Sequence, residues 1–537
     1  MKELSESIVF VDSTEAVPKK MLMEDIFRGR YTILICFFLQ CFTIIQLANM
    51  FFMSFAGLSV TIISCGNTTF PLEMSQKDIC NILPDLQAKS PCLLNYKSDF
   101  KSVNSEWGYV CGQTFEIKTS MAIQMAFVII GTVAGGQISD SYGRRKITLI
   151  GVLLCSAFCL VSSFSNNLIQ FTITRSLTGL FNGIITCVTL VFLMENTNKK
   201  HRLIIPNVIS WSINTPIFVL IAYLCQDWRT LAQCISFAAI PAAILVAYVS
   251  ESPKWLLQKG RIGEVKEAIK KIYRINNRPL CLKELDEFID TEYARIRIDS
   301  KKENKKHSYH HLFYTWKYIG YNFTLGFTLW IASMLVYGIM FSMEKLSGSI
   351  YWNLAIMGIF RYIVSLMVAA ADFKLKWLGR KVILIFFLFT ITVILGTIGG
   401  LYAFGLAVEF ATTIRILQLA LMVFTSQLYI VSAIFSSEIF TTSLRTLAFS
   451  LQQTNSRIGC LLAPYLFYLS AFGECAPYFL MLGCSITAMA GLFFLLPETK
   501  GKPANEVMPS NDERLRIFKK QSIIKGDEVE KMIQEKL

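Results

Sequence analysis

About twelve stretches of this chain are long and apolar enough to cross a lipid bilayer, which takes 18 or more mostly apolar residues. The whole chain agrees, because 53% of its 537 residues are hydrophobic and its mean hydropathy is +0.47, too apolar for a soluble protein. The first stretch is longer than the apolar core of a signal peptide, so we expect a retained helix. This predicts an all-α membrane protein with twelve transmembrane helices. They are expected at 31–60, 119–139, 147–165, 168–194, 203–225, 230–249, 317–341, 350–371, 382–404, 410–436, 442–469 and 475–496.

Three short charged motifs occur twice in the chain, each at the end of an apolar stretch. The two copies are separated by 236, 243 and 247 residues, close to half the chain. Repetition at this period in a very apolar chain indicates two similar halves, as in many secondary transporters. We therefore expect two pseudo-symmetric bundles of six helices. The pairs are Gly143-Arg144-Arg145 with Gly379-Arg380-Lys381, Glu195 and Arg202 with Glu438 and Arg445, and Glu251 with Glu498.

The net charge of +14 is distributed as membrane topology requires, not as a nucleic-acid site would require. Segment 254–306 carries fifteen Lys and Arg against nine acidic residues, whereas the loop 61–118 carries five against six. Because Lys and Arg accumulate on the cytoplasmic side, we expect the segment and both termini inside and the loop outside. No nucleic-acid partner is expected.

The expected domain order follows from these spans and charges. It is a cytoplasmic N-terminus (1–30), a first six-helix bundle (31–253) with the extracellular loop 61–118, a cytoplasmic linker with amphipathic helices (254–316), a second bundle (317–496) and a cytoplasmic tail (497–537).

The outer loop carries chemistry that belongs outside the cell. It holds four cysteines, Cys65, Cys80, Cys92 and Cys111, an even number in a compartment where disulfides form. Four cysteines allow three pairings, and the sequence does not choose among them. Asn67 begins an Asn-Thr-Thr glycosylation sequon in the same loop.

Two motifs in the first half resemble signatures of the major facilitator superfamily. GQISDSYGRRK at 136–146 follows the second span and resembles the G-x-x-x-D-R/K-x-G-R-R loop, with Gly136 and Asp140 in place and Ser141 where a base is usual. Arg175 opens an R-x-x-x-G-x-x-x-G pattern in the fourth span. In the second-half copy of the loop motif, Lys376 stands where an acid is expected, and Asp372 lies four residues earlier.

Further motifs resemble the organic ion transporters of that superfamily, which carry organic cations, carnitine and other zwitterions, or organic anions. The resemblance runs from about residue 31 to 501 and includes the large outer loop. It implies a two-bundle, alternating-access transporter of the plasma membrane. The motifs are EWGYVC at 106–111, DWR at 227–229, ESPKWLL at 251–257, SRIGCLLAP at 456–464 and PETKG at 497–501.

Charged side chains inside a span are costly and need a reason. Apart from Arg445 of the repeated motif, four arginines lie in predicted spans. Arg175 belongs to its helix motif, for which we expect a structural or conformational role. Arg415 lies at the start of its span, where its head group can snorkel to the interface. Arg361 and Arg457 lie nearer mid-span, and either each pairs with a buried acid or both form an anion site. The resemblance favours the anion site, because Arg457 falls where anion and carnitine carriers have Arg and cation carriers have Asp. Arg361 falls where anion carriers commonly have Lys.

Aromatic residues are expected to complete a site for an amphipathic ion. Trp330 and Tyr337 are seven residues apart and so share one face of a helix. The resemblance places this pair on the cavity wall, with Trp211 and Phe435 at two further aromatic positions of the cavity. Ordinary helix packing is the alternative for each of them.

These observations predict a transporter of amphipathic organic ions, with organic anions favoured. The bundles would rock while the Asp140/Arg144/Glu195 and Arg380/Glu438/Arg445 clusters break and reform on the cytoplasmic side. The expected partners are a small organic ion, the bilayer and a counter-ion or exchange substrate. A carnitine or cation carrier of the same family is the alternative, and a non-transporting receptor on the same fold is the alternative of another class. The outer loop and the intramembrane arginines disfavour a sugar porter.

Enzyme chemistry has little support in the sequence. There is no G-x-x-x-x-G-K-S/T nucleotide loop, which argues against ATP-driven pumping. Only four histidines occur, and His, Cys and carboxylates do not fall at metal-ligand spacing. We therefore expect no enzyme activity, no cofactor and no metal site.

Overall fold

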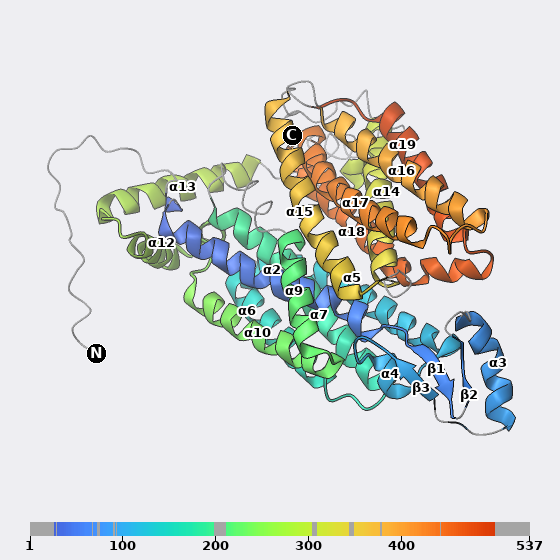
Figure 1. Cartoon of the computed structure of the whole chain (residues 1–537). Coiled ribbons are helices and arrows are strands. Elements are labelled where there is room, and N and C mark those ends of the chain that lie inside the picture. The colour runs from blue at the N-terminus through green and yellow to red at the C-terminus, as the bar shows by residue number, and fades with distance from the viewer. Residues whose placement is uncertain are drawn as a thin grey trace, which may run out of the picture. The chain divides into compact units, whose positions relative to one another are not determined.

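Long helices dominate the computed structural model (Figure 1). It describes residues 26–27, 29–66, 68–71, 76–89, 92, 94–197, 211–302, 309–342, 348–375, 379–440 and 442–499. Asn67, Arg202, Lys376 and the side chains of Asp372 and Arg445 lie outside the described part. The helices that correspond to the predicted spans are α2 (Arg30–Ala56), α5 (Thr114–Tyr142), α6 (Arg144–Ser162), α7 (Leu168–Asn196), α9 (Trp211–Cys225), α10 (Trp228–Tyr248), α14 (Trp316–Met340), α15 (Ile350–Lys374), α16 (Arg380–Ala403), α17 (Ala411–Ile439), α18 (Thr442–Leu462) and α19 (Ala476–Leu495).

Ten helices in the described residues are long and apolar enough to cross a membrane. The two other predicted spans correspond to α9, an apolar helix of 15 residues, and to α18. The predicted span 442–469 is not one continuous α-helix. α18 ends at Leu462, and a 3₁₀-helix, η4 (Ala463–Ala471), follows with Pro464 at its start. Proline lacks the N–H that an α-helix would need there, and its ring disfavours helical geometry for the residue before it.

The described chain divides into two compact units. The first comprises residues 1–304 and 348–359, and the second comprises 305–347 and 360–537. In the first unit α7 packs against α5 and α6, and α10 packs against α6 and α2. In the second unit α14 packs against α17, α18 and α19.

Close contact between α5 and α7 explains the glycine spacing after Arg175. A Cβ at Gly179 would lie 2.8 Å from the carbonyl oxygen of Gln124, so α5 comes too close for any larger residue. Small residues of this kind let helix backbones approach within a membrane.

Three linker helices complete the core of the first unit: α11 (Pro253–Gln258), α12 (Ile262–Asn276) and α13 (Leu282–Lys302). Figure 1 shows α12 and α13 beside the beginning of α2. Phe27, just before α2, is fully buried in one apolar cluster with residues of α12 and α13. Asn276 accepts a hydrogen bond from the backbone nitrogen of Tyr31 at 2.8 Å and donates one to the carbonyl of Ile26 at 3.1 Å. The apolar faces of these helices are therefore buried against the bundle.

The outer loop is a small disulfide-bonded domain. Its three-stranded sheet has the order β2 (Thr68–Thr69), β1 (Thr61–Cys65), β3 (Leu94–Lys97), with both pairs antiparallel. The helices α3 (Gln76–Lys89) and α4 (Val103–Trp107) and the short η1 (Cys111–Gln113) complete the domain. Two disulfides, Cys65–Cys92 and Cys80–Cys111, select one of the three pairings that the sequence allows.

Candidate functional site

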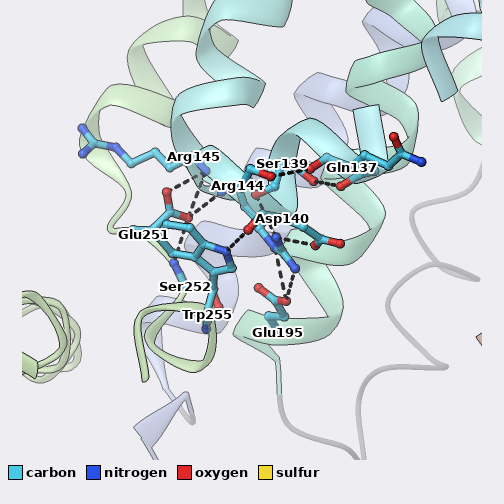
Figure 2. Close-up of polar contacts among 11 residues, drawn as sticks. Gln137, Ser139, Asp140, Arg144, Arg145, Glu195, Glu251, Ser252 and Trp255 are labelled. Atoms are coloured by element: carbon cyan, nitrogen blue, oxygen red, sulfur yellow. Dashed lines mark hydrogen bonds and ion pairs between the residues drawn. The ribbon is translucent and has the colours of Figure 1, made fainter. Parts of the chain in front are cut away.

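A cluster of ion pairs joins three helix ends in the first unit (Figure 2). Arg144 Nη1 lies 2.7 Å from Asp140 Oδ1, and its Nη2 lies 3.2 Å from Glu195 Oε1. The same guanidinium donates a 2.8 Å hydrogen bond to the carbonyl of Ser139. Because the Arg144 side chain is only 7% exposed, these acceptors replace the water that it has lost.

Glu251 caps the start of α6 beside this cluster. Its carboxylate accepts the backbone N–H groups of Arg144 and Arg145, each at 3.0 Å. These donors have no partner within the helix, and a carboxylate is favoured at a helix N-terminus. Burial raises the pKa of Glu251, although the backbone donors partly oppose this shift. Gly143 turns into the helix with φ of 109°, a conformation that favours glycine.

The arginine–glutamate pair and the carboxylate cap recur in the second unit. Arg380 Nε lies 3.3 Å from Glu438 Oε1, and Glu498 accepts the backbone N–H of Arg380 at 2.8 Å. It also accepts that of Lys381 at 3.1 Å. Gly379 precedes α16 as Gly143 precedes α6. Among the described residues, the repeated Gly-Arg-basic motif and the repeated acids Glu251 and Glu498 therefore make equivalent contacts in the two units.

The third residue of each motif, which is basic, also makes an equivalent contact in the two units. Arg145 Nε donates to the carbonyl of Val246 at 3.0 Å near the end of α10, and Lys381 Nζ donates to the carbonyl of Phe493 at 2.8 Å near the end of α19. Figure 2 shows the Arg145 side chain extending away from Glu195. A cation at a helix C-terminus satisfies carbonyls that have no partner within the helix.

Arg175 is fully buried between α7, α6 and α2. Its guanidinium lies 4.0 Å from the ring centroid of Phe52 and donates to the carbonyl of Asn49 at 3.2 Å and to Cys159 Sγ at 3.5 Å. In the described residues no carboxylate pairs with it. The side chain is sealed inside one bundle.

Arg457 lies in a polar cluster between α14, α17 and α18. Side-chain hydrogen bonds join it to Tyr337 and Cys460. Around these, Ser333 Oγ lies 2.7 Å from Ser456 Oγ and accepts from the hydroxyl of Tyr429 at 2.8 Å. Gly459 lets α18 approach, since a Cβ there would lie 2.5 Å from the carbonyl oxygen of Trp330.

Arg361 belongs to the same electrostatic neighbourhood, although it comes from α15. Tyr337 and Tyr429 lie close enough to interact with its charge. Its Nε is buried without a hydrogen-bond partner, while the residue as a whole is half-buried. Within the part of the chain that the structure describes, neither Arg361 nor Arg457 forms an ion pair with a carboxylate. The alternative in which each pairs with a buried acid therefore has no support there.

The four predicted aromatic residues lie in different surroundings. Tyr337 is 6% exposed beside Arg457, and the partly exposed Trp330 stacks on Phe327 with ring centroids 5.6 Å apart. Phe435 in α17 is fully buried. Trp211, in the first unit, is half-buried and meets Phe51 edge-on at 6.3 Å. Trp330, Tyr337 and Phe435 lie in the same unit as the two arginines, whereas Trp211 does not.

Comparison with known proteins identifies the family. Residues 82–509 match the family described as Sugar (and other) transporter, which is most of the chain. The chain belongs to this transporter family. It is therefore a membrane transporter rather than an enzyme.

Two curated relatives of the transporter carry more specific names. The chain is 25% identical over 455 residues to solute carrier family 22 member 21 of Mus musculus, which covers 81% of this chain and 76% of the relative. It is 25% identical over 448 residues to organic cation/carnitine transporter 2 of Homo sapiens, covering 78% of this chain and 72% of the relative. These similarities confirm the resemblance that the motifs predict.

A solved structure agrees in fold. The xylose transporter of E. coli in an inward-open conformation matches 89% of this chain and 99% of its own, with a TM-score of 0.58 and 15% identity. Another matching structure, a proton:xylose symporter with a TM-score of 0.57 and 15% identity, is described as a member of the major facilitator superfamily. The predicted fold class is thereby confirmed.

Sequence reasoning missed how several residues of the transporter act. The sequence identifies Glu251 and Glu498 as repeated residues, but it does not predict that they cap helices. Thr499 belongs to the PETKG motif, but the sequence does not predict that its hydroxyl donates to Glu438 Oε2 at 2.6 Å. The sequence does contain a signal for the caps. Each acid lies just beyond the sixth span of its half, and the two acids recur at an offset close to that of the motifs that begin the capped helices.

Proposed function

We propose that this protein is a secondary transporter that moves amphipathic organic anions across the plasma membrane by alternating access. The observation that carries this proposal is the pair of half-buried arginines, Arg361 and Arg457, which have no carboxylate partner in the described residues. A charge inside a membrane span costs on the order of 3 kcal/mol or more unless something compensates it. An acidic group on the substrate supplies that compensation, because a guanidinium binds carboxylate or sulfate with two parallel hydrogen bonds.

The surroundings of the two arginines suit an amphipathic substrate. Tyr337 and Trp330 offer apolar ring surface on the helix beside Arg457. The proposed binding mode places the acidic group at Arg457, with Arg361 as a second counter-charge, and the apolar body against these rings. Arg175 takes no part, since it is sealed within its own bundle.

The two ion-pair clusters would act as conformational locks. In the proposed cycle, the Asp140/Arg144/Glu195 cluster and the Arg380/Glu438 cluster open and close as the bundles rock. We place them on the cytoplasmic side, together with both termini and the linker, because the basic residues concentrate there. α5 has one end beside the disulfide-bonded domain and the other beside Asp140, so its 29 residues span about 43 Å.

A carnitine-type carrier is the second candidate. The relative named organic cation/carnitine transporter 2 favours it, and a zwitterion would use the same arginine for its carboxylate. The rings of Trp330 and Tyr337 would then hold a quaternary ammonium by cation–π contact.

Uptake by cells that express the protein tests these alternatives. Three labelled probes are compared, an aromatic dicarboxylate, carnitine and a quaternary cation, in wild type, Arg457→Ala and Arg361→Ala. Arg415→Ala serves as the matched control, because it removes an arginine at a span end outside the cluster. All rates are normalised to surface protein.

The proposal expects anion uptake that both cluster variants reduce and the control retains. Carnitine uptake without anion uptake would establish the second candidate. Cation uptake that does not depend on Arg457 would refute the arginine site. Absence of all uptake at normal surface level would favour a non-transporting receptor.

A further inference from the structure

Two free cysteines face each other where α9 turns into α10. Cys225 ends α9 and Cys234 lies in the second turn of α10. Their sulfur atoms are 3.4 Å apart, with the thiol of Cys225 donating to Cys234. All fifteen cysteines of the chain lie in described residues, and of the eleven free ones Cys234 is the only exposed side chain.

This thiol pair lies at the same end of the first unit as the two disulfides. Gln226, next to Cys225, accepts a backbone hydrogen bond from Lys101 of the outer loop at 2.9 Å. Trp228 donates one to the carbonyl of Lys101 at 3.1 Å. The turn after Cys225 is thus bound directly to the segment between β3 and α4, which lies within the loop closed by the Cys80–Cys111 disulfide. Disulfides form and persist in oxidising compartments, so the thiol pair is exposed to the same conditions.

We propose that Cys225 and Cys234 form a third disulfide site, made by exchange with a small-molecule disulfide such as oxidised glutathione. The exposed thiol of Cys234 loses its proton and attacks the small disulfide, releasing one small thiol and leaving a mixed disulfide. The sulfur of Cys225 then attacks Cys234 Sγ and displaces the second small thiol. Two cysteine thiols are oxidised, one small disulfide is reduced to two thiols, and the two protons leave on those thiols.

The geometry permits this bond with little rearrangement. A disulfide is about 2.0 Å long, so the sulfurs must approach by about 1.4 Å. Rotation of the side chains can supply this, because Cys225 is the last residue of its helix and Cys234 has free space. The bond would join α9, which carries Trp211, to α10 within one bundle.

A second thiol pair provides the matched control. Cys155 and Cys159 are one turn apart in α6, and both are buried. Cys155 donates to the carbonyl of Thr178 at 3.7 Å and Cys159 to that of Ala232 at 3.5 Å, so each thiol faces a different backbone carbonyl. Buried thiols of this kind are inert to exchange.

Peptide mapping of the full-length protein in cell membranes tests the proposal. Membranes are treated with oxidised glutathione or with buffer, and the protein is then denatured at low pH so that no further exchange takes place. Free thiols, now all accessible, are blocked with N-ethylmaleimide, and the protein is digested with trypsin. Cleavage after Arg229 separates the two cysteines into peptides 203–229 and 230–254, each with one cysteine. A disulfide therefore appears as these two peptides linked together, and dithiothreitol separates them. The control cysteines remain together in peptide 147–175.

The proposal expects the linked peptides to be the main form after oxidation, while both cysteines of peptide 147–175 carry maleimide. Cys225→Ser should leave Cys234 with a stable glutathione adduct, because the resolving thiol is gone. Maleimide on both Cys225 and Cys234 after oxidation would overturn the proposal. A glutathione adduct that persists on Cys234 of the wild type would also overturn the proposal, since it would show that the sulfur of Cys225 cannot reach Cys234 Sγ.

Discussion

Glu251 accepts the backbone N–H of Arg144 at 3.0 Å although the two residues are 107 positions apart in the chain. The contact ties the segment after the sixth span to the start of the third helix of the first half. Its counterpart, Glu498, holds the start of α16 at 2.8 Å. The two halves therefore close their bundles in the same way, at the end where the ion-pair clusters lie.

Removal of either capping carboxylate should destabilise the protein. Glu251→Ala leaves the first N–H groups of α6 without their acceptor in a partly buried site, and a cap or charged hydrogen bond of this kind contributes about 2 kcal/mol. We expect a melting temperature several degrees lower for Glu251→Ala and for Glu498→Ala, measured by thermal unfolding in detergent. Glu264→Ala is the control, because its pair with Arg261 is exposed and should contribute about 0.5 kcal/mol or less. Equal melting of all three variants would contradict the capping role.

Arg144 should prove essential to transport. Its guanidinium meets Asp140, Glu195 and the Ser139 carbonyl at once, whereas a lysine can meet fewer of them with a single ammonium. We expect Arg144→Ala to lower the initial uptake rate at least about tenfold, which corresponds to ~1.4 kcal/mol, and Arg144→Lys to retain part of it. Surface biotinylation shows whether each variant reaches the membrane. Wild-type uptake by Arg144→Ala would remove the cluster from the transport cycle.

The outer loop should loosen in acid. Arg229 holds Glu106 at 2.6 Å, and Trp228 donates to the same carboxylate at 2.9 Å. Burial alone would raise the pKa of Glu106, but these hydrogen bonds and the Arg229 charge together lower it below the ordinary 4.5. Because the folded pKa is lowered, the ionised carboxylate stabilises the folded protein above pH 4.5. This stabilisation is lost as the pH falls through the pKa of the folded state.

Melting temperature between pH 7 and pH 3 measures this contribution. We expect wild type to lose stability below pH 4.5 more steeply than Glu106→Gln, which carries no titrating group there. Parallel curves for the two proteins would show that Glu106 is not responsible for the acid sensitivity.

Any side chain at Gly459 should disrupt the packing of α18 against α14. A methyl group there would clash with the carbonyl of Trp330 and would lie 2.9 Å from the Ser333 side chain. We expect Gly459→Ala to cost about 2 kcal/mol and to weaken uptake by displacing Arg457. Gly400→Ala in α16 has nothing within 4 Å and should be neutral or slightly stabilising. Thermal unfolding of the two variants, with uptake measured in parallel, tests this prediction. Equal stability of Gly459→Ala and Gly400→Ala would contradict it.

The sequence predicts much of this architecture because its main signals are local. Apolar stretches define the helices, and the repeat of Gly143 and Gly379 indicates two halves. The change to a 3₁₀-helix at Ala463 escapes a hydropathy profile, since Pro464 is apolar and leaves the average unchanged. The disulfide pairing escapes it as well, because the path of the loop from Cys65 to Cys111 depends on its sheet.

The candidate site, too, is predicted only in part by the sequence. Arg361 and Arg457 stand out in the sequence because charge is rare in a span. The cluster of Tyr429, Ser333 and Ser456 around Arg457 does not, because hydroxyl residues are common in membrane helices and only their meeting from three helices distinguishes them. Caps such as Glu251 depend on a contact across 107 positions, which no local pattern reports.

The link between Tyr31 and Asn276 has a consequence for synthesis of the chain. The ribosome completes the first helix long before it reaches Asn276, so the amide of Tyr31 and the apolar surface of Phe27 wait without their partners while five more spans are inserted. The apolar core that α2 shares with the linker helices becomes complete only when the linker has left the ribosome and folded back onto the beginning of the chain. A chain that stops after the sixth span therefore contains every membrane helix of that half and still lacks the part that closes it.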